Sequence, residues 1–348
     1  MQHAIYRIID VNFNRAREAA RVMEEFARFA LNNPQLSGRV KSLRHKLSAQ
    51  ISSLDQKCLI MSRDSVDDVG LGLKVEGQLS RKSGIDVFTA AAKRLPEALR
   101  TLSETTQTFD PQMASDIEAL RFQAYELEKD ILIKLDTSEL YKDVRLYVLI
   151  DNSAGDKFQW LAEQCIEGGA DCLQLRCKNA DDGVRYDYGR KLADLCKGSG
   201  VISVINDSVD IALACGADGV HLGQDDMPPS AARSIYTRPL LTGLSTHNID
   251  QLKEAIAMDV DYVGIGPAFS TTTKPEIDVA GLGYVRNAVE MLSGTGIGHA
   301  VIGGIDDANL TQVLEAGAKC VAVHSVVTGS DKPKEVCKKL KEELLKQN

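Results

Sequence analysis

Residues 240–265 read LLTGLSTHNIDQLKEAIAMDVDYVGI, and this stretch holds one repeat of a strand, helix and strand pattern. A short apolar run begins at Leu240, a segment with helical spacing covers 249–257, and a second apolar run begins near Tyr262. Strands that alternate with helices pair in parallel, because the helix carries the chain back to the start of the next strand. The stretch therefore predicts an α/β fold.

The same pattern recurs from about residue 145 to the end of the chain. Short apolar runs rich in β-branched residues begin near Leu146, Cys172, Val201, Gly219, Leu240, Tyr262, Ala300 and Cys320. Most are separated by helical segments, at 160–167, 186–197, 229–235, 249–257, 282–292 and 309–316. These repeats predict a closed (β/α)8 TIM barrel, and an open doubly wound sheet is the alternative.

The N-terminal part of the chain has a different periodicity. Apolar positions over residues 10–50 follow helical spacing. Asp10 or Asn12 is the expected cap of a first helix. Pro34 and Gly38 mark a turn to a second helix. We therefore expect an all-α domain at 1–136, followed by the TIM barrel at 137–348.

Part of this helical pattern occurs twice. Residues 18–25 align with 97–104, and residues 42–44 align with 119–121, which indicates a weak duplication of a helical hairpin. Each copy has Glu, Arg and Glu at spacing i, i+3 and i+7, which predicts a salt-bridged helix face. These residues are Glu18, Arg21 and Glu25 in the first copy, and Glu97, Arg100 and Glu104 in the second.

Composition and charge exclude several classes of protein. The chain is 44% hydrophobic and 26% charged, as globular proteins are, and its formal net charge is −8. Residues 1–136 carry 20 Lys and Arg against 19 Asp and Glu, so neither part has the basic excess of a nucleic-acid or membrane-surface binder. The eight cysteines are scattered, as reduced thiols are. With neither a signal peptide nor an apolar stretch near the ~20 residues of a membrane span, we expect a cytoplasmic protein.

Polar residues follow nearly every predicted barrel strand. In chain order they are Asp151, Arg176, Lys178, Asn206, Asp207, Gln224, Asp226, Ser245, His247, the loop 266–275, Gly303, Gly304, His324 and Ser325. The carboxyl ends of barrel strands meet at one rim, and barrel enzymes keep their active sites there. The sequence therefore predicts an active site at this rim.

One part of the rim is cationic. Strand alternation puts Gln174, Arg176 and Lys178 on one face, where two cations need anions to meet them. Ion pairs with acids of the barrel are the alternative to a bound phosphate. Asp207 and Asp226 offer oxygen ligands that suit Mg²⁺ shared with a phosphorylated substrate.

A second part of the rim is neutral. Gly303 and Gly304 let main-chain N–H groups approach a ligand, and Ser325 follows the next strand. The loops after the last two strands of a barrel commonly bind phosphate. Between the two parts lies the loop 266–275, GPAFSTTTKP, for which a solvated connection is the alternative.

As a set, these motifs resemble the thiamine-phosphate synthase family. They are Leu146-Tyr147, QLRCK at 174–178, IND at 205–207, DGVHLGQDD at 218–226, GLSTH at 243–247, GIGPAFSTTTK at 264–274 and IGGI at 302–305. They occur in the family's order and cover nearly all of residues 143–345.

The resemblance implies a (β/α)8 enzyme of thiamine biosynthesis that uses Mg²⁺. Its substrates would be hydroxymethylpyrimidine diphosphate and phosphorylated hydroxyethylthiazole, with pyrophosphate released. It would need no nucleic acid and no membrane, and a homo-oligomer is compatible with the sequence. A thiazole tautomerase and a non-catalytic thiazole phosphate-binding protein are alternatives on the same barrel.

The resemblance also implies residue roles. The diphosphate site maps onto Arg176, Lys178, Asn206, Ser245 and Lys274, with Asp207 and Asp226 as Mg²⁺ ligands and Gln174 on the pyrimidine. The thiazole phosphate site maps onto Thr271, Thr273, Gly304 and Ser325. Two residues depart from the family's pattern. His324 stands beside the thiazole phosphate where an aliphatic residue is usual, and Ser208 replaces a larger polar residue.

The N-terminal region resembles an extension fused to some bacterial members of this family. A kinase role on hydroxymethylpyrimidine phosphate is one hypothesis for it, although no P-loop is present. An oligomerisation or docking module is the alternative. The basic candidates for the kinase hypothesis are Arg15, Arg21, Arg44, Arg63 and Arg81.

Overall fold

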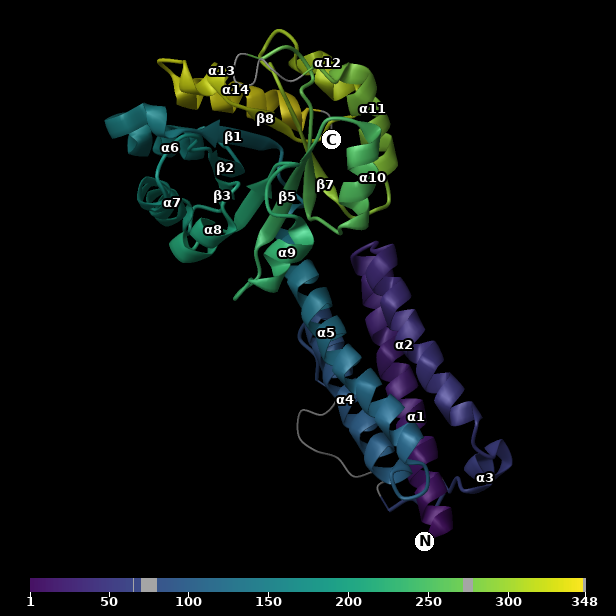
Figure 1. Cartoon of the computed structure of the whole chain (residues 1–348). Helices are drawn as coiled ribbons and strands as arrows, with labels where there is room; N and C mark the ends of the chain where they lie inside the picture. Colours follow the sequence, from purple (N-terminus) through teal and green to yellow (C-terminus); the bar gives the residue numbers. More distant parts are fainter. Residues whose placement is uncertain (65, 70–79, 272–277, 347–348) are drawn as a thin grey trace. The chain divides into compact units, whose positions relative to one another are not determined.

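The computed structural model of the chain describes residues 1–64, 66–69, 80–271 and 278–346 (Figure 1). The chain divides into two compact units, residues 1–135 and 136–348. Each unit has its own cluster of buried apolar side chains. Among the described residues, none of the helices combines the length and the apolar character that crossing a membrane requires.

The first unit is helical. Its elements are α1 (Gln2–Glu25), a π-helical turn (Phe26–Ala30), α2 (Pro34–Ser52), α3 (Gln56–Met61), α4 (Gly84–Thr106) and α5 (Pro111–Tyr141), whose end lies in the second unit. The predicted turn at Pro34 is confirmed, because Asn33 caps α2 by accepting the N–H groups of Gln35 and Leu36. Gly38 lies inside α2 rather than in the turn.

The prediction of Asp10 or Asn12 as a helix cap is wrong. Helix α1 begins at Gln2, so both residues lie inside it. The carboxylate of Asp10 is buried and accepts two hydrogen bonds from Arg63, at 2.7 and 2.8 Å. A polar residue that would cap a short helix instead binds a distant cation, because α1 extends further toward the N-terminus than its apolar periodicity indicated.

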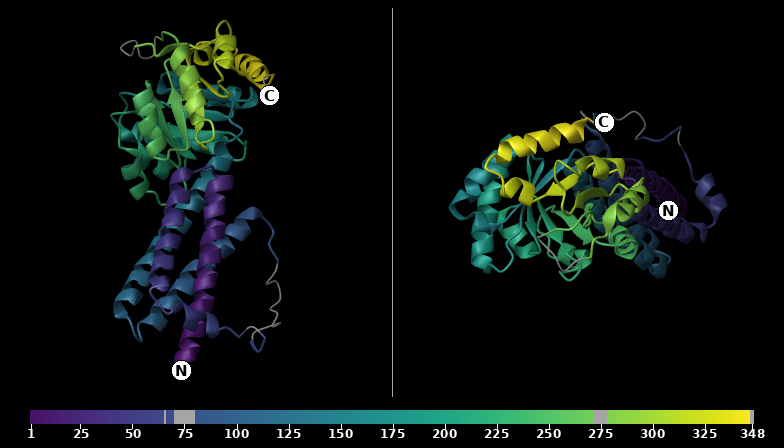
Figure 2. Two further views of the ribbon diagram at one scale, coloured as in Figure 1. Left: turned by 90° about the vertical axis from the view of Figure 1, so that its right-hand side faces the viewer. Right: turned by 90° about the horizontal axis from the view of Figure 1, so that it is seen from above.

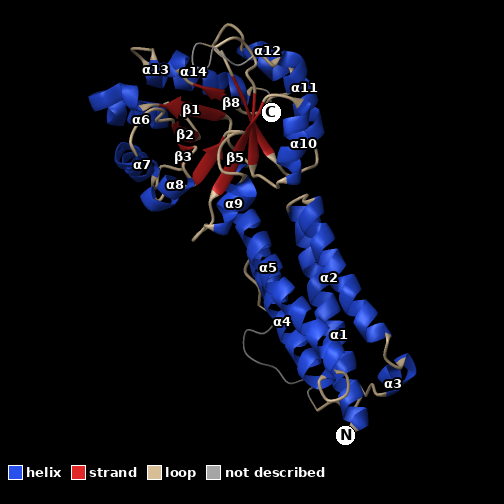
Figure 3. Ribbon diagram, viewed as in Figure 1, coloured by secondary structure: helices blue, strands red, loops and turns tan. Residues whose placement is uncertain are grey.

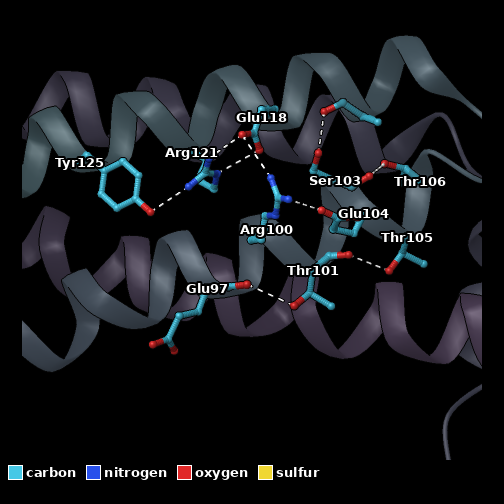
Figure 4. Close-up of polar contacts among 11 residues, drawn as sticks. Glu97, Arg100, Thr101, Ser103, Glu104, Thr105, Thr106, Glu118, Arg121 and Tyr125 are labelled. Atoms are coloured by element: carbon cyan, nitrogen blue, oxygen red, sulfur yellow. Dashed lines mark hydrogen bonds and ion pairs between the residues drawn. The ribbon is translucent and has the colours of Figure 1, made fainter.

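In both copies of the duplicated pattern, the Arg forms the predicted salt bridge with the second Glu. Arg21 pairs with Glu25 at 3.1 Å in α1, and Arg100 pairs with Glu104 in α4. Figure 4 shows that the second pair is part of a larger network. Arg100 also contacts Glu118 of α5 at 3.6 Å, and Arg121 binds the same carboxylate. These ion pairs join the faces of α4 and α5.

The second unit is a closed barrel of parallel strands in the order β1 to β8, as predicted (Figures 2 and 3). The strands are β1 (Leu146–Ile150), β2 (Cys172–Leu175), β3 (Ile202–Asn206), β4 (Gly219–Leu222), β5 (Leu241–Thr246), β6 (Tyr262–Ile265), β7 (Gly298–Ile302) and β8 (Val321–Val323). Every strand begins within two residues of its predicted position.

Helices cover the outside of the barrel (Figure 2). They are the 3-10 helix Asn152–Lys157, α6 (Phe158–Glu167), α7 (Asp182–Cys196), α8 (Val209–Cys215), α9 (Pro229–Ser234), α10 (Ile249–Ala257), α11 (Gly281–Leu292), α12 (Leu310–Glu315), α13 (Ser325–Thr328) and α14 (Pro333–Leu345). Strand alternation separates two cores. Val148 and Val220 pack outward among the helices, whereas Tyr147, Val204 and Tyr262 pack inside the barrel.

Three aspartates hold the N-terminal ends of neighbouring strands together. Asp171, Asp218 and Asp261 each stand immediately before an even-numbered strand. Their carboxylates accept backbone N–H groups at the start of the preceding strand, from Leu146, Ser203 and Thr242 respectively, at 2.8 to 2.9 Å. Asp261 also accepts the hydroxyl of Thr137 at 2.7 Å. These aspartate hydrogen bonds stabilise the end of the barrel opposite the predicted site.

We predict that Gly168→Ala destabilises the barrel. A Cβ at this position would lie 2.6 Å from Cβ of Cys337 and 2.8 Å from the Lys334 carbonyl, so α14 must move away. The expected loss is about 1–3 kcal/mol of unfolding free energy, measured by urea denaturation. Gly183→Ala is the matched control, because nothing lies within 4 Å of its Cβ. Equal midpoints for the two variants would contradict the prediction.

We also predict that His299 makes stability depend on pH. Its Nε2 accepts the N–H of Lys319 at 3.0 Å, and burial, with Lys319 and Arg145 nearby, lowers its pKa from 6.5 to about 4. Between these pH values the unfolded chain binds a proton that the folded chain does not, so stability falls as the pH drops from 6.5 to 4.

The loss expected over this range is on the order of 1–3 kcal/mol, from thermal unfolding at several pH values. The variant His299→Gln keeps an acceptor for the Lys319 N–H and has no proton to gain. It should lack this part of the pH dependence. An unchanged dependence in the variant would show that other groups cause it.

Candidate functional site

A cavity of about 500 Å³ opens at the carboxyl ends of the barrel strands. Its walls include eight of the residues predicted from the sequence: Gln174, Arg176, Asn206, Ser245, Thr271, Gly304, His324 and Ser325. They come from the ends of β2, β3, β5, β6, β7 and β8, which lie far apart in the sequence. Barrel closure brings them to one space.

Three other predicted site residues do not line this cavity. Lys178, Asp207 and Asp226 follow β2, β3 and β4, whose ends are neighbours, and lie outside the cavity wall. Thr273 and Lys274 lie outside the described residues. Their assignment stays a prediction.

The two aspartates are held by local geometry. Asp207 has a positive φ of 67° and lies 4.0 Å from the ammonium group of Lys178. The carboxylate of Asp226 accepts the N–H of Gly223 at 2.6 Å. Within the part of the chain that the structure describes, no three His, Cys, Asp or Glu side chains form a metal-binding group. Two carboxylates fit Mg²⁺, which is commonly bound by one or two of them together with substrate phosphate and water.

Arg176 brings a positive charge into the cavity. Its backbone N–H extends the pairing of β2 with β1 by donating to the carbonyl of Ile150 at 2.8 Å. This hydrogen bond fixes the position of the Arg176 backbone at the rim of the barrel. The guanidinium is half-buried in the cavity wall. It makes no ion pair with any residue that the structure describes. A half-buried cation without a carboxylate partner favours binding of an anion.

Gly303 and Gly304 are required where β7 ends. Both have positive φ, 109° and 62°. A Cβ on Gly303 would lie 2.5 Å from Pro267, and one on Gly304 would lie 2.4 Å from the carbonyl oxygen of Ser270. The loop after β7 therefore packs directly against the loop after β6. This packing holds Thr271 at the edge of the cavity.

His324 does more than fill space. Its Nε2 lies 3.1 Å from the carboxylate of Asp151, at the end of the neighbouring strand β1. Burial lowers the pKa of His324, although the carboxylate opposes this shift. The imidazole is therefore mainly neutral at neutral pH and presents a hydrogen-bonding ring to the cavity.

Sequence reasoning missed several residues at the bottom of the cavity. Tyr147 and Tyr262 point into it from β1 and β6. His221 lines the cavity too and contacts the hydroxyl of Ser245 at 2.9 Å. Inward positions of the strands, read from alternation, were the available signal for all three residues.

Three of the five basic candidates in the first unit, Arg21, Arg44 and Arg63, are paired with carboxylates. Arg44 binds the buried Glu24 at 3.0 Å, and Arg21 contacts Glu24 at 3.5 Å. Arg63 binds Asp10. These cations hold helices together in the structure as it stands.

Comparisons with known proteins identify the families that this chain resembles. The thiamine monophosphate synthase family matches residues 146–327, and the ThiD2 family matches residues 7–130. A thiamine-phosphate synthase of Nostoc punctiforme is 39% identical over 96% of this chain and 92% of its own length. A thiamine-phosphate synthase of Synechocystis sp. is 36% identical over 99% of this chain and 98% of its own length.

The barrel has a similar solved structure. A thiamine phosphate pyrophosphorylase from Pyrococcus furiosus superimposes with a TM-score of 0.54 at 32% identity, covering 59% of this chain and 96% of that protein. The full-length relatives extend the similarity across both units. The chain therefore belongs to the thiamine-phosphate synthase family and is an enzyme of thiamine biosynthesis.

Proposed function

We propose that the cavity at the strand ends couples hydroxymethylpyrimidine diphosphate to phosphorylated hydroxyethylthiazole. The observation that carries this proposal is the half-buried guanidinium of Arg176, which lines the cavity without an ion pair among the described residues. A diphosphate supplies the missing negative charge. The relatives named thiamine-phosphate synthase support the choice of substrates.

The reaction breaks one bond and forms another. The bond between the pyrimidine CH₂ group and the diphosphate oxygen breaks, and its electron pair leaves with the diphosphate. The amino group of the pyrimidine stabilises the resulting carbocation. The lone pair of the thiazole nitrogen then bonds to the CH₂ carbon. No proton has to move, so the protein mainly stabilises the leaving group and aligns the two substrates.

The leaving group has a cationic and hydrogen-bonding surround in this proposal. Arg176, Lys178 and Lys274 bind the diphosphate, and Asn206 and Ser245 donate hydrogen bonds to it. Asp207 and Asp226 would hold Mg²⁺, which neutralises diphosphate charge when bound. Gln174 contacts the pyrimidine.

The thiazole phosphate occupies the opposite wall in this proposal. Thr271, Thr273, Gly304 and Ser325 bind its phosphate, and the neutral His324 lies beside it. The tight packing of the loops after β6 and β7 supports this assignment, because it holds Thr271 and Gly304 along one edge of the cavity. A rigid edge keeps the thiazole nitrogen in line with the CH₂ carbon.

The alternatives on the same barrel explain fewer residues. A thiazole tautomerase handles only the thiazole phosphate and has no use for Arg176 together with Lys178, Asp207 and Asp226. A non-catalytic binding protein would bind thiazole phosphate without releasing pyrophosphate. The family membership, which is that of an enzyme, favours catalysis.

We predict that Arg176→Met lowers kcat/KM for the pyrimidine diphosphate on the order of 100-fold or more, because developing charge on the diphosphate loses its buried cation. Pyrophosphate release measures the rate. Arg190→Met is the matched control, because this exposed arginine of α7 pairs with Asp194 at 3.0 Å. Similar rates for both variants would refute the role of Arg176.

A second function is proposed for the first unit. We take domain boundaries of 1–136 and 137–348, and the ThiD2 match at 7–130 favours an activity in the first domain over a docking role. The activity is phosphorylation of hydroxymethylpyrimidine phosphate by ATP, which would supply the diphosphate substrate of the barrel. Because Arg21, Arg44 and Arg63 are paired with acids, phosphate binding there requires these ion pairs to rearrange.

The kinase proposal predicts that the intact chain turns hydroxymethylpyrimidine phosphate, ATP, Mg²⁺ and thiazole phosphate into thiamine phosphate. Residues 136–348 alone should fail with the monophosphate but succeed with the diphosphate, which controls for folding of the fragment. This fragment keeps Thr137 and Tyr141, which contact the barrel at Asp261 and Tyr262. An intact chain that leaves the monophosphate unchanged would refute the kinase.

A further inference from the structure

A chain of hydrogen bonds crosses the inside of the barrel beneath the cavity. The Gln174 amide donates to the hydroxyl of Tyr147 at 2.8 Å, which lies 2.9 Å from the hydroxyl of Tyr262. The Tyr262 hydroxyl lies 3.1 Å from Nδ1 of His221, whose Nε2 lies 2.9 Å from the hydroxyl of Ser245. Five different strands, β2, β1, β6, β4 and β5, each contribute one residue.

The Gln174 amide decides which group donates and which accepts along this chain of hydrogen bonds. The Gln174 NH₂ group can only donate, so the Tyr147 oxygen accepts. If each hydroxyl then accepts once and donates once, Tyr147 donates to Tyr262, and Tyr262 donates to Nδ1 of His221. A neutral imidazole that accepts at Nδ1 carries its proton on Nε2 and donates it to Ser245. The Ser245 proton is then directed to a further acceptor in the cavity.

Burial keeps the phenols in this arrangement. Tyr147 is 2% exposed and Tyr262 is fully buried. Burial also raises the pKa of both phenols well above the ordinary value, so both stay protonated. The ring of Tyr262 stacks on Tyr141 with centroids 4.4 Å apart and an interplanar angle of 11°.

Two glycines leave room for this chain of hydrogen bonds. A Cβ on Gly243 would lie 2.5 Å from both Nδ1 of His221 and the Tyr262 hydroxyl, the two atoms that are hydrogen-bonded. A Cβ on Gly264 would lie 3.2 Å from Cε1 of His221. The absence of a side chain at these two positions leaves room for the imidazole of His221. This independent feature of β5 and β6 fits a built contact rather than accidental packing.

We propose that Tyr262 and His221 are positioning residues that orient the Ser245 hydroxyl as a hydrogen-bond donor to the departing diphosphate. The proposal rests on the assignment of Ser245 to the diphosphate under the proposed function. A neutral donor with a fixed direction stabilises charge as it develops on the leaving oxygen and needs no reorganisation during the reaction. Neither Tyr262 nor His221 has to touch the diphosphate.

The first test is the variant Tyr262→Phe in the full-length chain. It keeps the stacked ring and removes the hydroxyl that lies 3.1 Å from Nδ1 of His221. We expect kcat to fall about 10-fold while KM for thiazole phosphate stays unchanged, because the lost orientation affects only the leaving group. Tyr141→Phe is the matched control. Its hydroxyl contacts the His299 carbonyl at 3.3 Å and Cys320 at 3.8 Å, and neither residue belongs to the chain of hydrogen bonds. A kcat for Tyr262→Phe equal to that of the control would overturn the proposal.

The second test measures directly which nitrogen of the His221 imidazole carries the proton. Nitrogen-15 NMR of the ligand-free wild-type protein should show His221 with Nε2 protonated and Nδ1 unprotonated, assigned by loss of the signals in His221→Gln. Tyr262→Phe should shift His221 toward a mixture of tautomers. A proton on Nδ1 in the wild type would overturn the proposal, even if the variant fails to fold.

The variant Ser245→Ala separates this proposal from the proposed function. Loss of turnover in Ser245→Ala with normal turnover in Tyr262→Phe refutes only the positioning role. Normal turnover in Ser245→Ala refutes the assignment of Ser245 to the diphosphate and the positioning role with it. Loss in both variants, together with the predicted tautomer, supports the two proposals.

Discussion

Closure of the parallel strands into a barrel is the constraint on which the rest of the second unit depends. It puts the carboxyl ends of β1 to β8 on one rim, so residues distant in the sequence face one cavity. It also buries polar groups inside the barrel, and buried polar groups need hydrogen-bond partners. The hydrogen bonds from Gln174 to Ser245 meet this requirement with amide, phenol, imidazole and hydroxyl groups. The same closure therefore creates the site and decides which kinds of side chain can lie beneath it.

Charge is arranged by depth in this barrel. The deep positions carry phenol, amide, imidazole and hydroxyl groups, of which Tyr147 and Gln174 are nearly fully buried. Arg176 lies half-buried above them, and Lys178 and Asp207 lie at the more exposed rim. Burying a charge costs far more free energy than burying a paired neutral group. The charged end of a substrate is therefore expected toward the mouth, with the uncharged ring deeper.

The sequence predicted the features that depend on local pattern. Apolar runs and helical spacing located the strands and most outer helices, although α8, α13, α14 and the 3-10 helix after β1 were not identified. Motif residues at strand ends predicted most of the cavity wall. The Tyr147, Tyr262 and His221 contacts depend on which inward side chains meet across the barrel, and no short segment encodes this. The role of Asp171 likewise appears only when the strand pairing is known.

The arginines considered for phosphate binding differ in their partners, and this difference bears on the proposed functions. In the first unit Arg44 and Arg63 bind buried carboxylates, so an incoming phosphate would have to displace a partner at a free-energy cost. In the barrel Arg176 has no such partner among the described residues and faces a cavity. Under the proposed functions, a diphosphate meets Arg176 without displacing a carboxylate among the described residues, whereas a phosphate that bound Arg21, Arg44 or Arg63 would have to displace their present partners. A phosphate site built on these three arginines therefore needs a rearrangement of ion pairs that the proposed site at Arg176 does not.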